Sequence, residues 1–412
     1  MSDNKRFISG NIISVYRMQT NSQKWLILLL TFLLIPNSLA IIRALETRMG
    51  LSAFAPFSDA ILISIAVIGS VGIWRHCIKI QDLLFLLAVV IIHYLSAVVY
   101  PDTATLSKEN ADFFIWSCLP MYLVGLAITR DTPREVFVLM SYVAIILQVL
   151  FLSFLGMGTT DEGDAIIELM GAAYRLVPFV LFLLWYAFEH GNLLNYMVAF
   201  VGVFILLSLG TRGPIICLLT FVVLYFLFFK SFKRNLLVKS IIVIVAAMFI
   251  FFSNEIMIEL GSFAEALGLS TRVFDSAMKG SFANYQESSG RDDIWGGIFS
   301  YITNNDLYWG KGLYSDRLIS YYGGYAHNLE LELLCDFGLV GGAIVIALLT
   351  WLIVKAFLKS RGTEGSLIML VLFCSVIIYL QLSTSFLQLN SFWFFIGISV
   401  SMSRICLLRI KR

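Results

Sequence analysis

The chain has 412 residues, of which 59% are hydrophobic and only 14% are charged, and its formal net charge is +2. A soluble globular protein is about half apolar, whereas the mean hydropathy here is +0.86. These values exclude a soluble protein and indicate an integral membrane protein. The near-neutral charge also gives no reason to expect a nucleic-acid partner.

The first apolar run, residues 25–43, follows a basic stretch, and Ser38-Leu39-Ala40 has the spacing of a signal cleavage site. We interpret the run as an uncleaved span, because it is long for a signal peptide and continues beyond Ala40. A bilayer core needs roughly 20 apolar residues per helix. Twelve runs fit this length: 25–43, 57–74, 82–99, 113–129, 135–157, 174–190, 193–209, 214–229, 235–253, 329–355, 365–384 and 390–408.

The sequence therefore predicts an all-α integral membrane protein, with a single polytopic domain over residues 1–412. Its one large polar loop, residues 254–327, lies between spans nine and ten. If the N-terminus is cytoplasmic, most of the 29 lysines and arginines fall in the inner connections, as the positive-inside rule requires. Both termini are then cytoplasmic, and the large loop and the acidic connections at 102–112 and 161–168 face the outside.

The six cysteines all lie in or beside apolar runs, and none forms a Cys-Xaa-Xaa-Cys pair. We therefore expect neither a disulfide framework nor a zinc site. The cysteines are Cys77, Cys118, Cys217, Cys335, Cys374 and Cys406.

The large loop carries two segments with apolar residues at helical spacing, 255–267 and 294–302, which we interpret as short amphipathic helices at the membrane interface. Its tyrosines and tryptophans suit a headgroup-level site or a sugar-stacking surface. An interfacial aromatic belt explains them equally well. The short Gly310-Lys311-Gly312 sequence is expected to be a turn.

His327 is the only histidine on the predicted outer side, immediately before a helix. A neutral imidazole, with a pKa near about 6.5, is a natural general base. The alternative is that His327 is only a polar residue at a helix entry, with Asn328 as the N-cap.

Arginines are the second group of candidates. Arg212 joins two apolar runs at an outer helix end, where it would bind an anion or reach lipid phosphates. Arg291 opens the second loop helix and would contact a diphosphate or pair with Asp292 and Asp293. Further outer cations are Arg175, Arg272 and Arg317.

Acidic residues suggest no metal. Asp292 and Asp293 are adjacent, so on a helix their side chains diverge by about 100°. Glu332 and Asp336 share one helix face and are expected to face a wet cavity or an arginine rather than lipid. One base and several arginines beside a membrane suit a lipid diphosphate donor: the arginines stabilise the departing diphosphate, and His327 deprotonates an acceptor hydroxyl.

The arrangement resembles the O-antigen ligase and O-antigen polymerase superfamily of bacterial envelope proteins. The motifs that carry the resemblance are Thr211–Gly213, Gly290–Trp295, Trp309–Gly312, and His327-Asn328 followed by Leu334–Gly341. The resemblance covers roughly residues 200 to 345. Thr211 stands where the family usually has serine.

The resemblance implies a glycosyltransferase of the bacterial inner membrane with an undecaprenyl-diphosphate-linked glycan donor. It places Arg212 and Arg291 on the diphosphate and His327 as the catalytic base, with Arg175, Arg272, Arg317, Tyr325 and Asn328 as further substrate contacts. No metal or other cofactor is implied, since the first outer loop has only Glu46 as an acidic residue. A protein that regulates chain length is an expected partner.

The resemblance leaves two activities open. A polymerase joins lipid-linked repeat units to one another, and a ligase moves the finished chain to the lipid A core. We favour the polymerase, because polymerases are the more varied group. A lipid-linked oligosaccharide flippase is a third alternative, but the chain lacks the repeat between halves and the charged spans expected of one.

Overall fold

We analysed a computed structural model of the chain. It describes residues 78–128, 134–155, 162–191, 193–209, 212–229, 259, 262, 291–304, 308–319 and 324–404. Every regular element within these ranges is helical. The predicted spans at 25–43, 57–74 and 235–253 and the predicted loop helix at 255–267 lie outside the described residues or almost entirely so.

The helical elements follow the predicted apolar runs. They are α3 (Ile80–Val99), α4 (Pro101–Phe113), η2 (Phe114–Cys118), α5 (Leu119–Ala127), α6 (Arg134–Leu155), α7 (Glu162–His190), α8 (Leu193–Ser208), α9 (Arg212–Leu224), η3 (Tyr225–Phe229), α14 (Arg291–Asn304), α15 (Asp316–Ile319), α16 (Leu329–Ser360), α17 (Glu364–Leu372), η5 (Phe373–Ile377), α18 (Ile378–Leu380) and α19 (Asn390–Ser403).

Four of the described helices are long and apolar enough to cross a membrane: Ile80–Val99, Pro101–Ala127, Met170–His190 and Leu329–Ser360. Three shorter apolar helices accompany them, at Leu193–Leu206, Gly213–Phe228 and Glu364–Leu380. The chain is thus a helical membrane protein, as predicted. The total of twelve spans stays a prediction.

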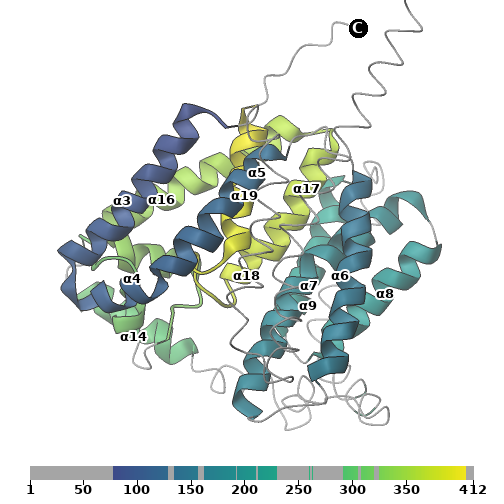
Figure 1. The fold of residues 1–412 in the computed structure, drawn as a ribbon, viewed down its shortest axis with the longest axis horizontal. Helices are drawn as coiled ribbons and strands as arrows, with labels where there is room; N and C mark the ends of the chain where they lie inside the picture. The colour runs from purple at the N-terminus through teal and green to yellow at the C-terminus, as the bar shows by residue number, and fades with distance from the viewer. Residues whose placement is uncertain are drawn as a thin grey trace, which may run out of the picture.

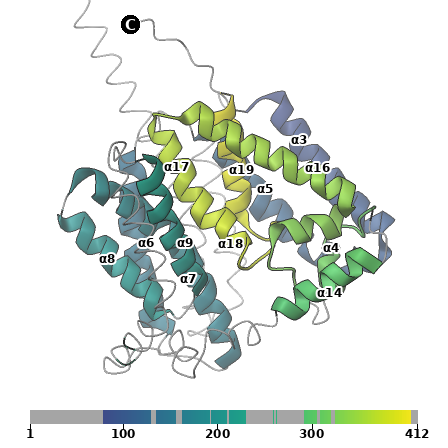
Figure 2. The same ribbon diagram turned by 180° about the vertical axis from the view of Figure 1, so that it is seen from behind.

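The helices form two groups that meet at α17 and α18 (Figure 1). One group contains α3, α4, α5, α14, α16 and α19, and the other contains α6, α7, α8 and α9. Figure 2 shows α16 running diagonally from the side of α4 and α14 to the start of α17. The two ends of α16 therefore belong to different faces of the protein.

The closest helix contact lies between α5 and α19. A Cβ atom at Gly125 would overlap the Phe394 carbonyl oxygen, and one at Gly397 would overlap the Tyr122 carbonyl oxygen. Small residues let helix backbones approach in this way in membranes, where dispersion rather than the hydrophobic effect holds helices together. Contacts between the last helix and α5 therefore organise the centre of the first group.

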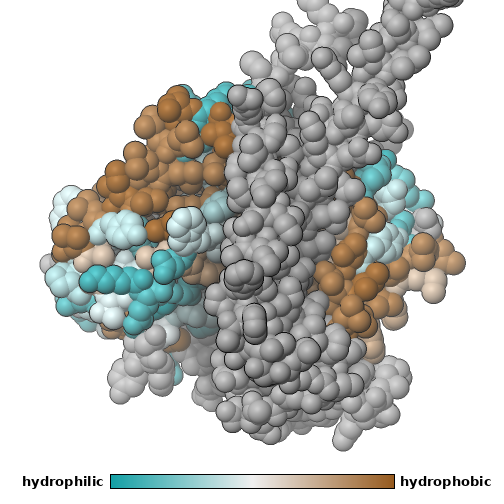
Figure 3. All heavy atoms as spheres, in the orientation of Figure 1, coloured by the Kyte–Doolittle hydropathy of each residue, from teal (hydrophilic) through white to brown (hydrophobic). Residues whose placement is uncertain are grey.

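Apolar side chains cover the outer faces of the bundle. Figure 3 shows hydrophobic surface on both flanks, over the regions where Figure 1 places α3 and α8. Leu87 is 55% exposed on α3, and Phe200 is 70% exposed on α8. In a soluble protein such contiguous surface would mark a binding site; here it is the surface expected against lipid.

The two acidic connections are helical rather than looped. Pro101 occupies the first turn of α4, where its missing N–H removes no hydrogen bond, and residues 102–113 continue as a helix that packs on α3. Residues 162–168 are likewise the first two turns of α7. The expectation that these two acidic segments are loops was wrong, because a polar helix can extend beyond the apolar part of a span.

The tenth predicted span is broken. Gly338, inside α16, has φ 76° and ψ 176°, a conformation favoured only by glycine. A helix that ends leaves its last carbonyl groups without partners. The Lys311 N–H donates to the Cys335 carbonyl oxygen (3.1 Å) and the Gly312 N–H to that of Asp336 (3.2 Å), so the predicted turn caps the broken helix.

We expect Gly338→Ala to destabilise the protein by more than about 2 kcal/mol, since alanine disfavours this φ and its Cβ would lie 2.5 Å from the Gly310 nitrogen. Thermal unfolding of the detergent-purified protein would measure the change. Gly297→Ala in α14 is the matched control, because nothing lies within 4 Å of a Cβ there. Equal melting temperatures for the two variants would contradict a required left-handed residue at 338.

Candidate active site

His327 stands at the start of α16, and its own backbone is left-handed, with φ 52°. Asn328 is the N-cap: its side-chain oxygen accepts the Leu331 N–H (2.9 Å), and its amide nitrogen donates to Gln381 Oε1 (3.0 Å). The predicted cap is therefore confirmed. A left-handed non-glycine residue directly before a capped helix costs free energy, so the neighbouring contacts must hold His327 in this conformation.

Ala326, the residue before His327, is held from both sides. Its N–H donates to Asp316 Oδ2 (2.7 Å), and its carbonyl oxygen accepts the indole N–H of Trp295 (2.8 Å). Asp316 is fully buried, and burial raises the pKa of its carboxyl group, an effect that the Ala326 N–H and Arg317 oppose. The backbone on either side of His327 is thus fixed by Asp316, Trp295 and Asn328.

Two further carboxylates fix the first turns of α16. Glu332 accepts hydrogen bonds from the Ser385 hydroxyl and, at 3.3 Å, from the Phe386 N–H. Asp336 accepts from the N–H and the hydroxyl of Ser315 (3.2 and 3.3 Å). Both side chains are buried rather than exposed to lipid, as expected, and Arg317 lies near Glu332. Asp336 Oδ2 has no hydrogen-bond partner among the described residues.

The helix that Arg291 opens packs against the start of α16. Ile294 and Ile298 of α14 form a small buried cluster with Ala326, Leu331 and Cys335. The prediction of an amphipathic helix at 294–302 is confirmed by α14. Arg291 is the first residue of this helix, so its backbone is placed beside the entry to α16.

Arg212 is the first residue of α9, and aromatic rings connect this helix start to His327. A Cβ at Gly213 would overlap the Tyr174 hydroxyl. Tyr174 stacks on Tyr379, with ring centroids 3.5 Å apart.

Tyr325 and the half-buried Arg175 of α7 lie near Tyr379. The Tyr325 ring lies 4.2 Å from that of His327. The starts of α9 and α16 therefore lie on one side of the bundle.

The remaining predicted residues are placed as follows. Arg317 lies over the Tyr314 ring, 4.9 Å from its centroid, and Arg272 is outside the described residues. Sequence reasoning missed Tyr174, Tyr379 and Asp316. The two tyrosines lie in apolar runs and Asp316 in a polar turn, so nothing in their sequence surroundings marks them.

Among the described residues, no three His, Cys, Asp or Glu side chains are grouped as metal ligands. The described cysteines, Cys118, Cys217, Cys335 and Cys374, are buried and free.

The model of one protein family, described as O-antigen ligase, matches residues 196–346. This part of the chain is similar to the O-antigen ligase family. The match confirms the resemblance predicted from the motifs, and its range contains Arg212, Arg291 and His327. No match was found among curated proteins or among solved structures.

We expect Asp316→Ala to lower the enzymatic activity strongly, because it removes the acceptor for the Ala326 N–H. Leaving a buried donor unpaired costs about 1–3 kcal/mol, so the melting temperature should also fall. Asp316→Asn keeps an oxygen acceptor and should restore much of both. If alanine and asparagine have the same activity, Asp316 does not act through this hydrogen bond.

Proposed function

We propose that the protein is an O-antigen or surface-polysaccharide polymerase that joins undecaprenyl-diphosphate-linked repeat units at the periplasmic face of the bacterial inner membrane. The family match supports a polymerase- or ligase-type function. The observation that carries the proposal is the arrangement of three separate segments. The start of α14 packs on the entry to α16, where His327 stands, and the stacked rings of Tyr174 and Tyr379 lie beside the start of α9.

The proposed reaction uses one base and two cations. His327 accepts the proton of an acceptor sugar hydroxyl as its oxygen bonds to the anomeric carbon of the donor. The bond from that carbon to the diphosphate oxygen breaks, and undecaprenyl diphosphate leaves. Arg212 and Arg291 neutralise the charge that develops on this leaving group.

The positions of the two arginines support this role. Each is the first residue of a helix, and the first N–H groups of a helix bind phosphate well. A guanidinium group can also contact two phosphate oxygens at once. Arg175, Arg272, Arg317, Tyr325 and Asn328 would contact the glycan or the diphosphate, and the proposed step needs no metal.

The acceptor separates a polymerase from a ligase, and an assay with purified protein decides between them. Lipid-linked repeat units supplied alone should give a ladder of longer chains. If chains grow only after a lipid A core is added, the protein is a ligase. If labelled lipid crosses the bilayer without forming a new glycosidic bond, the protein is a flippase. The expected partner that regulates chain length would alter the ladder's upper limit.

We expect His327→Ala to abolish transfer, with a loss of about 100-fold or more, as for removal of a general base. The rate of ladder formation in proteoliposomes would measure it. His190→Ala is the matched control, because His190 is an exposed histidine at the C-terminal end of α7. Wild-type rates in a well-folded His327→Ala variant would remove the base assignment.

We expect Arg212→Lys to lower the transfer rate by about tenfold or more, because lysine keeps the charge but loses the two-point contact with the diphosphate. Arg212→Ala should be slower still. An Arg212→Lys variant as fast as wild type would instead indicate a general attraction to lipid phosphates.

A further inference from the structure

The end of α16 far from His327 borders a pocket. The pocket, of about 790 Å³, lies among the last residues of α7, α9 and α16 and the first turns of α17. Its size is within the range of about 300–1,000 Å³ that is typical of small-molecule sites. Because α16 runs from His327 to this pocket, the pocket cannot belong to the proposed transfer site.

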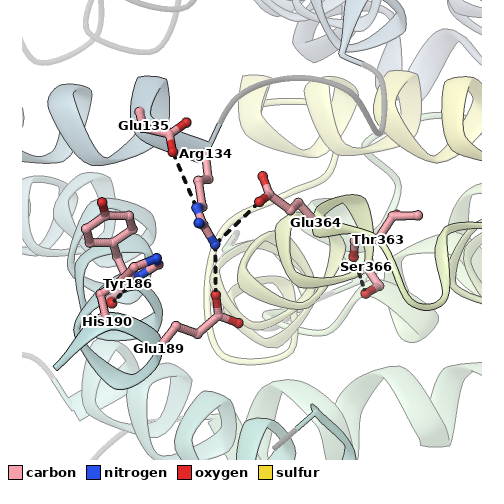
Figure 4. A network of polar contacts seen from close by, with 8 residues as sticks. All are labelled: Arg134, Glu135, Tyr186, Glu189, His190, Thr363, Glu364 and Ser366. Atoms are coloured by element: carbon pink, nitrogen blue, oxygen red, sulfur yellow. Dashed lines mark hydrogen bonds and ion pairs between the residues drawn. The ribbon is translucent and has the colours of Figure 1, made fainter.

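One end of the pocket is polar. Glu189, Arg361 and Glu364 line it, and Arg134 links the two carboxylates, at 3.2 Å from Glu189 and 3.4 Å from Glu364 (Figure 4). Arg361 is exposed, and no described carboxylate lies within ion-pair distance of it. The polar end thus offers an accessible guanidinium group beside two carboxylates that share one arginine.

The other end of the pocket is apolar and opens toward lipid. Phe228 and Leu358 line it and are 72% and 65% exposed. Leu224, Leu367 and Leu370 form its inner wall. A ligand that fills the pocket therefore needs a hydrocarbon part that can continue into the bilayer.

We propose that this pocket binds a glycerophospholipid with a zwitterionic aminoethyl phosphate headgroup. The lipid phosphate contacts Arg361, the ammonium group contacts Glu364 and Glu189, and an acyl chain lies against Phe228 and Leu358. The pocket lining holds two carboxylates, Glu189 and Glu364, and one guanidinium group, Arg361, so a headgroup that brings its own cation fits better than an anionic one. Lys355, Lys359 and Arg361 assign this end of α16 to the cytoplasmic leaflet.

Photo-crosslinking of the full-length protein in nanodiscs tests the proposal. Phosphatidylethanolamine and phosphatidylglycerol, each with a photoreactive acyl chain, are compared at equal mole fraction, and adducts are mapped by mass spectrometry. Phosphatidylethanolamine should label peptides that contain residues 224–228 and 357–370. Arg361→Ala should lower this labelling by about tenfold, the effect of one charge-assisted hydrogen bond.

Lys359→Ala is the matched control, since Lys359 is a neighbouring cation that does not line the pocket, and it should leave labelling unchanged. Glu364→Gln should lower the preference for phosphatidylethanolamine over phosphatidylglycerol. Phe228→Ser, a second variant at the apolar end, should also reduce labelling. Equal labelling by both lipids, or labelling unaffected by Arg361→Ala, would overturn the proposal.

Discussion

Hydrogen bonding of three buried carboxylates, Asp316, Glu332 and Asp336, is the constraint on which the rest of this structure depends. A buried carboxylate is unfavourable unless donors surround it, and each of these three accepts hydrogen bonds from a different connection. Asp316 fixes the entry to α16, Asp336 fixes the turn after α14, and Glu332 fixes the segment between α18 and α19. The stretch between α14 and α16 and the segment between α18 and α19 are thereby held beside the first turns of α16.

This constraint explains how His327 can be held in one conformation without being part of a helix. His327 is left-handed and lies between a residue held by Asp316 and Trp295 and a residue that caps α16. The break at Gly338 serves the same arrangement, because it frees carbonyl groups that accept the Lys311 and Gly312 N–H groups. Contacts of the neighbouring residues therefore position the His327 backbone, and its ring lies beside that of Tyr325.

Much of the helical fold could be predicted from the sequence, and much of the site could not. Long apolar runs gave α3, α7 and α16, because membrane helices must satisfy their backbone hydrogen bonds internally. Helical spacing identified α14, and position before a helix identified the Asn328 cap. Hydropathy does not report which distant residues meet, so the stack of Tyr174 on Tyr379 and the partners of Glu332 stayed hidden. The break at Gly338 was hidden too, since glycines also occur inside unbroken membrane helices.

Residues 196–346, the range that the family model matches, are in contact with residues outside it. Residues 196–346 carry Arg212, Arg291 and His327, but Tyr174, Tyr379, Gln381 and Ser385, which contact the site, lie outside it. The helices before and after this range therefore supply the frame that brings its motifs together.

Contacts between residues 82–127 and residues 387–404 have a consequence for biosynthesis. The Cys118 thiol donates to the Leu387 carbonyl oxygen across 269 positions of the chain, and Asp82 pairs with Arg404 across 322. Contacts this distant in sequence form late. The early helices are therefore inserted into the bilayer before their partners at residues 387–404 have been synthesised. The bundle can close only after α19 is inserted.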